Sequence, residues 1–385
     1  MSLSACPHQP PCDGCPRFGA QGVARAPRET LRDLAHAHGL PAVAEHSGEL
    51  FGFRHRARLA IRGRRGAPKI GLFEAGSHHV VHIPNCRVHH PLINEVAGVV
   101  RGALAQAQVT CYSDRAHLGR ARYLQVVIER RSMTAQVVLV VNAITAEPLI
   151  QCLELIRARL GSRLHSLWLN FNTEPNNVIL GSQFHHHCGA ATVIEEFGGA
   201  DVYYPPGAFG QSNLEMAGKI VGHIRDRITP GARVTEFYAG VGAIGLSILD
   251  QAGALTLNEV SPASLEGLQM GVAQLTAAQR NRIRVVPGAA GAASDAARGA
   301  DLVIVDPPRK GLDPQLTQYL AQQPPAQLIY VSCSLESFAH DAQQLQAAGG
   351  LVLTELTAFN LMPFTEHVET VALWRRAFIA GGSAG

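Results

Sequence analysis

Runs of apolar, β-branched residues that end abruptly in polar or turn residues dominate the C-terminal half of the chain. Two examples are DLVIVDPPRKGLD at 301–313 and QLIYVSCSLESF at 327–338. A buried parallel strand ends in this way, and its last side chains arrive at the carboxyl edge of the sheet. The first run delivers Asp306 to that edge and the second delivers Cys333. Because ligands bind there in open α/β sheets, the pattern predicts an active site.

Strand-like and helix-like segments alternate after residue 206. RVTEFYAG, LTLNEV and RIRVVPG have the pattern of strands, AIGLSILD and PASLEGLQMGVAQL that of helices, and LVLTELTAFN and HVETVALWRR form a last strand pair. Such alternation predicts an α/β fold with a mostly parallel, doubly wound, Rossmann-like sheet. Paired prolines and a glycine in DVYYPPGAFGQSN mark a boundary, which gives an expected C-terminal domain over 204–385.

The first 203 residues predict a separate α+β domain. YLQVVIE, AQVVLVVN and HSLWLNFN are strand-like, and a helix-like stretch lies around 148–160. The FHHHC tract at 184–188 is interpreted as part of a hairpin, since adjacent histidines on a strand point to opposite faces. Residues 51–65 alternate between an apolar face and a basic one. This basic stripe suits a phosphate backbone or is an ordinary solvated face, and its members are Arg54, Arg56, Arg58, Arg62 and Arg64.

Composition narrows the class of protein only modestly. The chain has 385 residues, 46% of them hydrophobic, and a formal net charge of +3, which permits a nucleic-acid partner without requiring one. No export signal or membrane-spanning run is recognisable, so the expected location is cytoplasmic with no membrane partner. Eight cysteines in such a chain indicate metal binding or catalysis rather than a disulfide framework.

Three cysteines lie close together at the start of the chain. Cys6, Cys12 and Cys15 have the spacing C-x5-C-x2-C in a loop rich in proline, and Cys86 in HIPNCRVHHP is the candidate fourth ligand. Four thiolates suit either a tetrahedral zinc ion or a cubane iron–sulfur cluster, and spacing does not separate the two. The alternative is a set of unconnected thiols. Cys111, Cys152 and Cys188 are expected to be buried as small apolar residues.

A glycine-rich loop follows the first strand of the C-terminal domain. Gly240, Gly242 and Gly245 form a G-x-G-x-x-G, and Glu259 ends the next strand. Glycines allow a ligand to approach the backbone, and an acidic residue at the next strand tip binds ribose hydroxyls. The motif alone suits a nicotinamide cofactor about as well as S-adenosylmethionine.

Several motifs occur in the order found in one family. The chain resembles the RNA uracil-5 methyltransferases through PPGAFGQSN, FYAGVGAIGL, NEV, VDPPRKG, YVSCS and MPFTEHVE. The resemblance covers nearly the whole chain, and the cysteine pattern is similar to that of the iron–sulfur-containing members acting on 23S ribosomal RNA. No counterpart of the small N-terminal β-barrel of some members is expected.

The resemblance implies a mechanism and a set of roles. Cys333 would add to carbon 6 of uracil, Glu369 would remove the proton from carbon 5, and Asp306 would place the flipped base. S-adenosylmethionine would be held by Gln211, Tyr238, Gly240, Gly242, Glu259 and Asp306. A 4Fe-4S cluster would be bound by Cys6, Cys12, Cys15 and Cys86. The implied partner is RNA, ribosomal rather than transfer RNA, and the expected state is a monomer.

Two positions depart from the family pattern, and other functions stay open. Ala243 and Ser334 stand where members commonly have asparagine, and Tyr238 could serve packing rather than the cofactor. One alternative is another class I methyltransferase, because D-P-P-R is similar to the N/D-P-P-Y/F motif of amino methylases. A second is an RNA-binding iron–sulfur protein without catalysis. A nicotinamide-dependent dehydrogenase is disfavoured by the cysteine and the D-P-P-R motif.

Overall fold

The computed structural model describes residues 5–377, and the chain divides into two compact units. The first unit comprises residues up to 20, 49–195 and 203–215, and the second comprises 21–48, 196–202 and the chain from 216 onward. The predicted division at 203/204 did not anticipate that residues 21–48 belong to the second unit. They do so because the short strand β1 (Ala44–His46) pairs with β16 (Leu351–Phe359). A three-residue strand has too little alternation to be recognised in a sequence.

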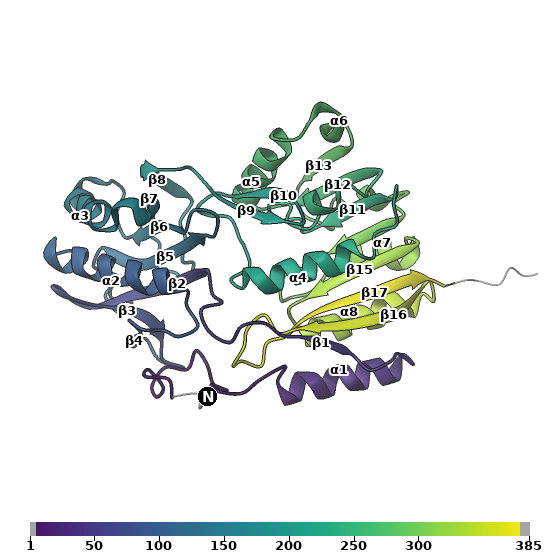
Figure 1. Ribbon diagram of the computed structural model, residues 1–385, viewed down its shortest axis with the longest axis horizontal. Helices are drawn as coiled ribbons and strands as arrows, with labels where there is room; N and C mark the ends of the chain where they lie inside the picture. Colours follow the sequence, from purple (N-terminus) through teal and green to yellow (C-terminus); the bar gives the residue numbers. More distant parts are fainter. Residues whose placement is uncertain (1–4, 378–385) are drawn as a thin grey trace, which may run out of the picture. The chain divides into compact units, whose positions relative to one another are not determined.

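A seven-stranded sheet with the order β4-β3-β2-β5-β6-β7-β8 forms the first unit (Figure 1). Its only parallel pair among the described strands is β6–β7, which α3 connects; the other pairs are antiparallel. The elements are β2 (Arg56–Arg64), β3 (Ala67–Phe73), β4 (Val80–His82), α2 (Pro91–Gln106), β5 (Ala121–Glu129), β6 (Thr134–Val141), η1 (Glu147–Leu149), α3 (Ile150–Leu160), η2 (Gly161–Arg163), β7 (Leu164–Phe171) and β8 (Gln183–Gly189).

Helices α2 and α3 pack on one face of this sheet. Alternate residues of β2, namely Ala57, Leu59 and Ile61, enter the core with apolar positions of α2 such as Ile93 and Val100. The period-2 pattern of residues 51–65 therefore predicted the direction of these side chains correctly. It also predicted that the arginines of β2 lie on the opposite face of the sheet.

The prediction that this opposite face is an exposed basic stripe is wrong for two of its arginines. Arg56 is 9% exposed, and its Nη1 donates to the carbonyl oxygen of Ala208 at 2.7 Å while the guanidinium lies 5.1 Å from the Tyr204 ring centroid. Arg62 is 7% exposed. Both are covered by segments distant in sequence, which the alternation within one strand cannot reveal. Arg58 and Arg64 are the exposed arginines of the strand.

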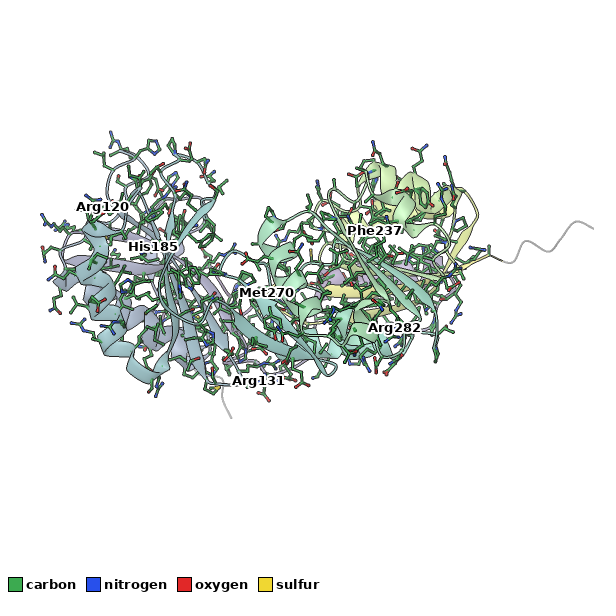
Figure 2. The ribbon with its side chains drawn as sticks, turned by 90° about the horizontal axis from the view of Figure 1, so that it is seen from above. Arg120, Arg131, His185, Phe237, Met270 and Arg282 are labelled. Carbon is green, nitrogen blue, oxygen red and sulfur yellow. The ribbon has the colours of Figure 1, made fainter. Side chains whose placement is uncertain are left out.

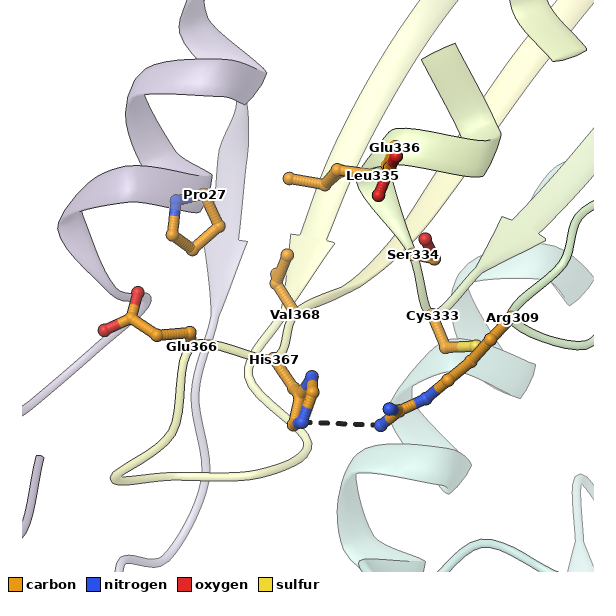
Figure 3. Close-up of a pocket in the computed structure, with 9 residues that line it drawn as sticks. All are labelled: Pro27, Arg309, Cys333, Ser334, Leu335, Glu336, Glu366, His367 and Val368. Carbon is orange, nitrogen blue, oxygen red and sulfur yellow. Dashed lines mark hydrogen bonds between the residues drawn. The ribbon is translucent and has the colours of Figure 1, made fainter. Parts of the chain in front are cut away.

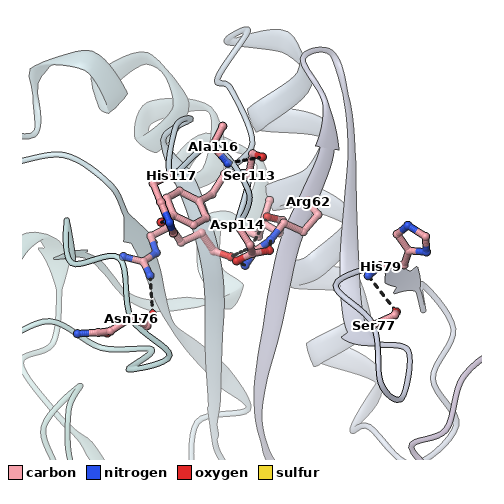
Figure 4. Close-up of polar contacts among 11 residues, drawn as sticks. Arg62, Ser77, His79, Ser113, Asp114, Ala116, His117 and Asn176 are labelled. Carbon is pink, nitrogen blue, oxygen red and sulfur yellow. Dashed lines mark hydrogen bonds and ion pairs between the residues drawn. The ribbon is translucent and has the colours of Figure 1, made fainter.

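Arg62 is the centre of a buried polar cluster (Figure 4). Its Nε and Nη2 each donate to a carboxylate oxygen of Asp114 at 2.7 Å, and its guanidinium lies between 5.2 and 5.4 Å from the ring centroids of Phe73, Tyr112 and Tyr123. A bidentate pair with cation–π contacts is stabilising only while both charges are present.

We therefore expect Arg62→Ala to lower the free energy of unfolding by about 3 kcal/mol, because it leaves Asp114 without its buried cation. Arg64→Ala, on the same face of the same strand but exposed, is the matched control and should change stability by less than about 0.5 kcal/mol. Chemical denaturation of both variants measures the difference. Equal effects of the two substitutions would contradict a structural role for Arg62.

The second unit is built on an eight-stranded sheet with the order β1-β16-β17-β15-β14-β11-β12-β13. β17 runs antiparallel to β15 and β16, and the other pairs are parallel, so the predicted mostly parallel, Rossmann-like sheet is confirmed. The remaining elements are α1 (Arg25–Ala37), α4 (Leu214–Arg225), β11 (Arg233–Phe237), η3 (Leu246–Ile248), β12 (Ala254–Glu259), α5 (Pro262–Ala273), α6 (Ala277–Arg280), β13 (Ile283–Pro287), η4 (Ser294–Ala297), β14 (Leu302–Val305), α7 (Pro314–Gln322), β15 (Gln327–Ser332), α8 (Leu335–Ala347) and β17 (Glu369–Arg376).

Both faces of the second sheet are buried. Phe237, labelled in Figure 2, belongs to the apolar core that the sheet forms with α1, α7 and α8. The alternate strand residues Val234, Ile304 and Ile329 are also buried, as expected for parallel strands covered on both sides. The segment AIGLSILD does not form the predicted α-helix. Its regular structure is the 3₁₀ turn η3 over Leu246–Ile248.

Residues 183–189 form the strand β8, which pairs antiparallel with β7, so the hairpin interpretation of the histidine tract is confirmed. His186 stacks on Trp168 with ring centroids 4.2 Å apart, and His185 is labelled in Figure 2.

The strands β9 (Val193–Phe197) and β10 (Ala200–Tyr204) pair with each other in a separate two-stranded sheet. Over residues 5–377, no helix has both the length and the apolar character needed to cross a membrane.

Candidate active site

Three candidate catalytic side chains meet at one edge of the second sheet. Asp306 directly follows β14, Cys333 directly follows β15, and Glu369 is the first residue of β17. β14, β15 and β17 are neighbours in the sheet, and Ser332 pairs with Thr370 across β15 and β17. Because β17 is antiparallel, its first residue lies at the edge where the other two strands end. Cys333 and Glu369, which are the residues next to Ser332 and Thr370, therefore lie side by side at that edge.

A cavity of about 250 Å³ opens beside Cys333 (Figure 3). Arg309 and His367 line it, and the Nη2 of Arg309 lies 3.3 Å from the Nε2 of His367. The sequence analysis gave these two residues no role. Arg309 belongs to the D-P-P-R motif and His367 precedes Glu369 by two positions, so both were within motifs already recognised. They add a cation and an imidazole beside the thiol.

Burial and like charges govern the protonation of this site. Burial raises the pKa of Glu369 to about 8, with a further contribution from Asp306, and burial raises the pKa of Asp306 to about 7. The pKa of the Cys333 thiol is raised to about 11 by burial and by the charges of Glu369 and Asp306. Arg309 opposes the shifts at Cys333 and Glu369. Near neutral pH the Cys333 thiol and much of the Glu369 and Asp306 carboxyl population are therefore protonated.

The raised pKa of Glu369 has a consequence for stability. The folded protein favours the protonated carboxyl of Glu369 more strongly than the unfolded chain does. The contribution of Glu369 to the stability of the folded state is therefore complete below its usual pKa of 4.5 and is lost as pH rises through about 8. We expect the melting temperature to fall between pH 5 and pH 9, with at most about 5 kcal/mol attributable to Glu369. Thermal melts of Glu369→Gln, which cannot ionise, should show a smaller fall, and other buried carboxyls with raised pKa values, Asp306 and Glu236, contribute to the remainder. Parallel pH profiles for the two proteins would refute the assignment.

The loop that carries Arg309 is fixed by the buried side chain of Asp341 and the half-buried side chain of Tyr238. Asp341 on α8 accepts hydrogen bonds from the Leu312 backbone N–H at 2.8 Å and from the Tyr330 hydroxyl at 2.7 Å. The Tyr238 hydroxyl accepts one from the Asp313 backbone N–H at 2.9 Å. In the structure Tyr238 thus anchors this loop, and its predicted contact with the cofactor stays a prediction. Its φ of 62° places the residue in the left-handed region.

The glycine-rich loop is joined to the tip of β12 by Glu259. One carboxylate oxygen of Glu259 accepts from the Gly240 backbone N–H at 2.7 Å, and the other accepts from the backbone N–H groups of Val260 and Ser261 at 2.8 and 2.6 Å. Gly240 has φ of 58° and open space where a Cβ would stand, whereas a Cβ on Gly242 would lie 2.7 Å from a Leu268 methyl carbon. The loop therefore presents open backbone at Gly240 and tight packing at Gly242.

Glu236 is a buried carboxyl beneath this loop that the sequence analysis missed. It is 1% exposed, and its Oε2 has no hydrogen-bond partner in the described part of the chain. Burial raises its pKa well above the usual value, with Asp306 contributing. An acidic residue in the middle of the apolar run RVTEF was the available signal. Together with Asp306 and Glu369, it is a buried carboxyl with a raised pKa near this edge of the sheet.

Ser334, one of the two departures from the family pattern, caps helix α8. Its hydroxyl oxygen accepts from the Ser337 backbone N–H at 3.4 Å, and its own N–H donates to the Ser332 hydroxyl at 3.2 Å. Serine and asparagine are both favourable N-cap residues, so this substitution preserves the helix start next to Cys333. Nothing in the structure explains Ala243. Gln211 lies in the 203–215 segment of the first unit, and its contact with the cofactor stays a prediction.

The cysteine loop of the first unit is tied to the segments that surround Cys86. Asp13 accepts from the Ala75 backbone N–H at 2.9 Å, and the Nε2 of His8 lies 3.3 Å from the backbone nitrogen of Asn85. Burial raises the pKa of Cys15 to about 12, and Cys86, Cys12 and Cys6 contribute. In the described residues, no group of three or more His, Cys, Asp or Glu side chains is arranged to hold a single metal ion.

The chain is similar to several known proteins. Residues 200–377 match the family model described as tRNA (uracil-5-)-methyltransferase. An uncharacterized RNA methyltransferase of Protochlamydia amoebophila is 35% identical over 97% of each chain, and one of Geobacter sulfurreducens is 29% identical over 97% of this chain and 77% of its own length. Among solved structures, a Pyrococcus abyssi tRNA (uracil-54, C5)-methyltransferase in complex with S-adenosyl-L-homocysteine superposes with a TM-score of 0.73 at 23% identity, covering 90% of this chain and 81% of its own.

The sequence and structural matches point to the same family and fold. The full-length match at 35% identity establishes the family, and the superposition establishes the fold. The chain therefore belongs to the family of RNA (uracil-5-)-methyltransferases, which take the methyl group from S-adenosylmethionine.

Proposed function

We propose that the protein methylates carbon 5 of a uridine in 23S ribosomal RNA through a covalent adduct with Cys333. The observation that supports this proposal most directly is the pairing of Ser332 with Thr370, which brings the adjacent residues Cys333 and Glu369 to the same edge of the sheet as Asp306. Carbon 5 of uracil is a poor nucleophile and becomes reactive only when a group adds to carbon 6. A thiolate can both add and leave, which a serine alkoxide does poorly.

Each residue has one task in this proposal. Cys333 loses its thiol proton to solvent, and its sulfur bonds to carbon 6 of uracil. The electron pair displaced onto carbon 5 then accepts the methyl group that S-adenosylmethionine would supply, and the cofactor would leave as S-adenosylhomocysteine. Glu369, as carboxylate, then accepts the proton from carbon 5, and the bond from carbon 6 to sulfur breaks. Asp306 holds the uracil edge. Arg309 provides positive charge for the thiolate, since it opposes the rise in the pKa of Cys333.

Ribosomal RNA is the proposed substrate because the four-cysteine pattern is similar to that of family members acting on it. The test is incubation of the anaerobically purified protein with unmodified ribosomal RNA or transfer RNA and methyl-labelled S-adenosylmethionine, followed by digestion to nucleosides. We expect labelled 5-methyluridine from ribosomal RNA. Label in transfer RNA alone would refute the choice of RNA, and label on another base would refute the reaction.

The active form is proposed to be a monomer, because no step requires a second chain.

We also propose that Cys6, Cys12, Cys15 and Cys86 bind a 4Fe-4S cluster. The four thiols influence one another electrostatically, as the raised pKa values of Cys12, Cys15 and Cys86 indicate after the larger effect of burial. In a cubane cluster each thiolate binds a different iron, so the sulfur atoms stand farther apart than around one ion. The partly buried guanidinium of Arg54 interacts with Cys86 and Cys15 and suits a negatively charged group. When bound, the cluster would connect the N-terminal loop to the segment around Cys86.

We expect Cys86→Ser to lose the cluster and Cys188→Ser, a half-buried thiol on β8, to keep it. Iron and acid-labile sulfide are measured per chain in anaerobic preparations, together with visible absorption. The parent and Cys188→Ser proteins should contain about four of each, and Cys86→Ser should contain little. Zinc without sulfide in the parent protein would show that the ligand is a single ion instead.

A further inference from the structure

A second cavity lies at the opposite end of the strands that carry the proposed catalytic residues. It has a volume of about 370 Å³, and its lining includes Arg298, Gly299, Tyr319, Gln323, Pro324 and Arg376. These residues adjoin the first residues of β14 and β15 and the last residue of β17. Along β17, Glu369 and Arg376 are seven residues apart, roughly 24 Å in an extended strand. The cavity is therefore separate from the site around Cys333.

The lining of this cavity combines cations with neutral donors. Arg298 and Arg376 are exposed at the cavity, and an Nη2 of Arg376 donates to the carbonyl oxygen of Pro324, which holds that side chain in place. None of the nine lining residues is acidic. Asp301, which borders this segment of chain, accepts from the backbone N–H of Arg233 at 2.8 Å and pairs with its side chain. The cavity thus has positive charge without a carboxylate to neutralise it.

Tyr319 gives the second indication that a ligand binds here. Its hydroxyl oxygen is buried and has no hydrogen-bond partner among residues 5–377. A buried polar group without a partner destabilises a protein, so such groups are uncommon in native structures. A bound acceptor would satisfy this hydroxyl and the two guanidinium groups together. The acceptor that suits them is an oxyanion, because guanidinium groups bind phosphate oxygens with matching geometry.

We propose that this cavity binds a phosphate group through Arg298, Arg376 and the Tyr319 hydroxyl. The group could be a phosphodiester of the RNA substrate or free phosphate, which offer the same oxygens to these donors. The RNA source rests on the proposed function, whereas binding of free phosphate does not. The experiment therefore has one arm without RNA or cofactor, and failure of methyl transfer leaves that arm interpretable.

The first arm is equilibrium dialysis of the full-length protein against radiolabelled inorganic phosphate at constant ionic strength. We expect one phosphate per chain, about tenfold weaker binding in Tyr319→Phe, and loss of binding in Arg298→Ala/Arg376→Ala. Arg284→Ala, an exposed arginine on β13, is the control and should bind as the parent does. In phosphate-free buffer Tyr319→Phe should melt at or above the temperature of the parent protein, because it removes a polar atom without a partner. A lower melting temperature would show that the hydroxyl is already satisfied and would overturn the proposal.

The second arm measures how RNA affinity depends on salt. If RNA provides the phosphate, Arg298→Ala/Arg376→Ala should reduce the slope of log affinity against log salt by about 0.7 for each phosphate that is no longer neutralised, and inorganic phosphate should compete with RNA. An unchanged slope, with phosphate binding abolished in the dialysis arm, would identify free phosphate as the ligand. No phosphate bound by the parent protein, together with an unchanged slope, would overturn the proposal.

Discussion

Replacing Cys333 by alanine is expected to abolish formation of 5-methyluridine, with a loss of rate on the order of 10⁴ or more. The reason is chemical, because without a group added to carbon 6 the uracil ring has no nucleophilic carbon 5. The side chain is half-buried at the end of β15, and its truncation leaves the strand and the Ser334 cap of α8 in place. The measurement is single-turnover methylation of RNA with labelled S-adenosylmethionine.

A matched control distinguishes chemistry from folding. Cys111→Ala removes another half-buried thiol, in the first unit, and should retain activity. RNA containing 5-fluorouridine offers a second measurement, since fluorine at carbon 5 cannot leave as a proton. The parent protein should form a covalent RNA complex that survives denaturation, and Cys333→Ala should form none. A Cys333→Ala protein that still methylates RNA would instead favour a methyltransferase of the amino type.

Glu369→Gln is expected to allow the bond between the Cys333 sulfur and carbon 6 and the bond between the methyl group and carbon 5 to form. It should block the removal of the proton from carbon 5 that releases the product. Glutamine fits the same space but cannot accept the proton from carbon 5, so the methylated adduct should accumulate on Cys333. General-base catalysis typically contributes 10²–10⁴-fold, and we expect turnover to fall by about that factor. Denaturing electrophoresis with ordinary uridine RNA would detect the trapped complex.

The pH dependence of turnover gives an independent check on Glu369. As the base it must be ionised, and its pKa is raised to about 8 chiefly by burial, so the rate with the parent protein should rise with pH through about that value. Ionisation of Cys333, whose pKa is raised to about 11, should extend the rise to higher pH. Glu266 is an exposed carboxylate on α5, away from the cavity beside Cys333, and Glu266→Gln is therefore the control, which should keep the pH profile of the parent. Free release of product by Glu369→Gln, with no trapped complex, would assign the base to another residue.

The tertiary structure was needed to identify the partners of the site. Arg309 and His367 stood in recognised motifs, yet only the packed loops show that both line the cavity beside Cys333. The arginines of β2 are a similar case. Their alternation correctly indicated one face of the strand, but burial of Arg56 and Arg62 depends on segments far along the chain.

The sequence by itself determined the α/β class, the succession of strands after residue 206, and the strand ends that carry Asp306 and Cys333. These features follow from local rules, because burial on both faces selects continuous apolar runs and the end of such a run marks the edge of the sheet. Only the tertiary structure decided that Glu369 is opposite Cys333, that Tyr238 anchors the loop at Asp313, and that β1 joins the second sheet. Those relations depend on strand pairing between distant segments, and hydrophobic periodicity within one segment contains no information about its partner.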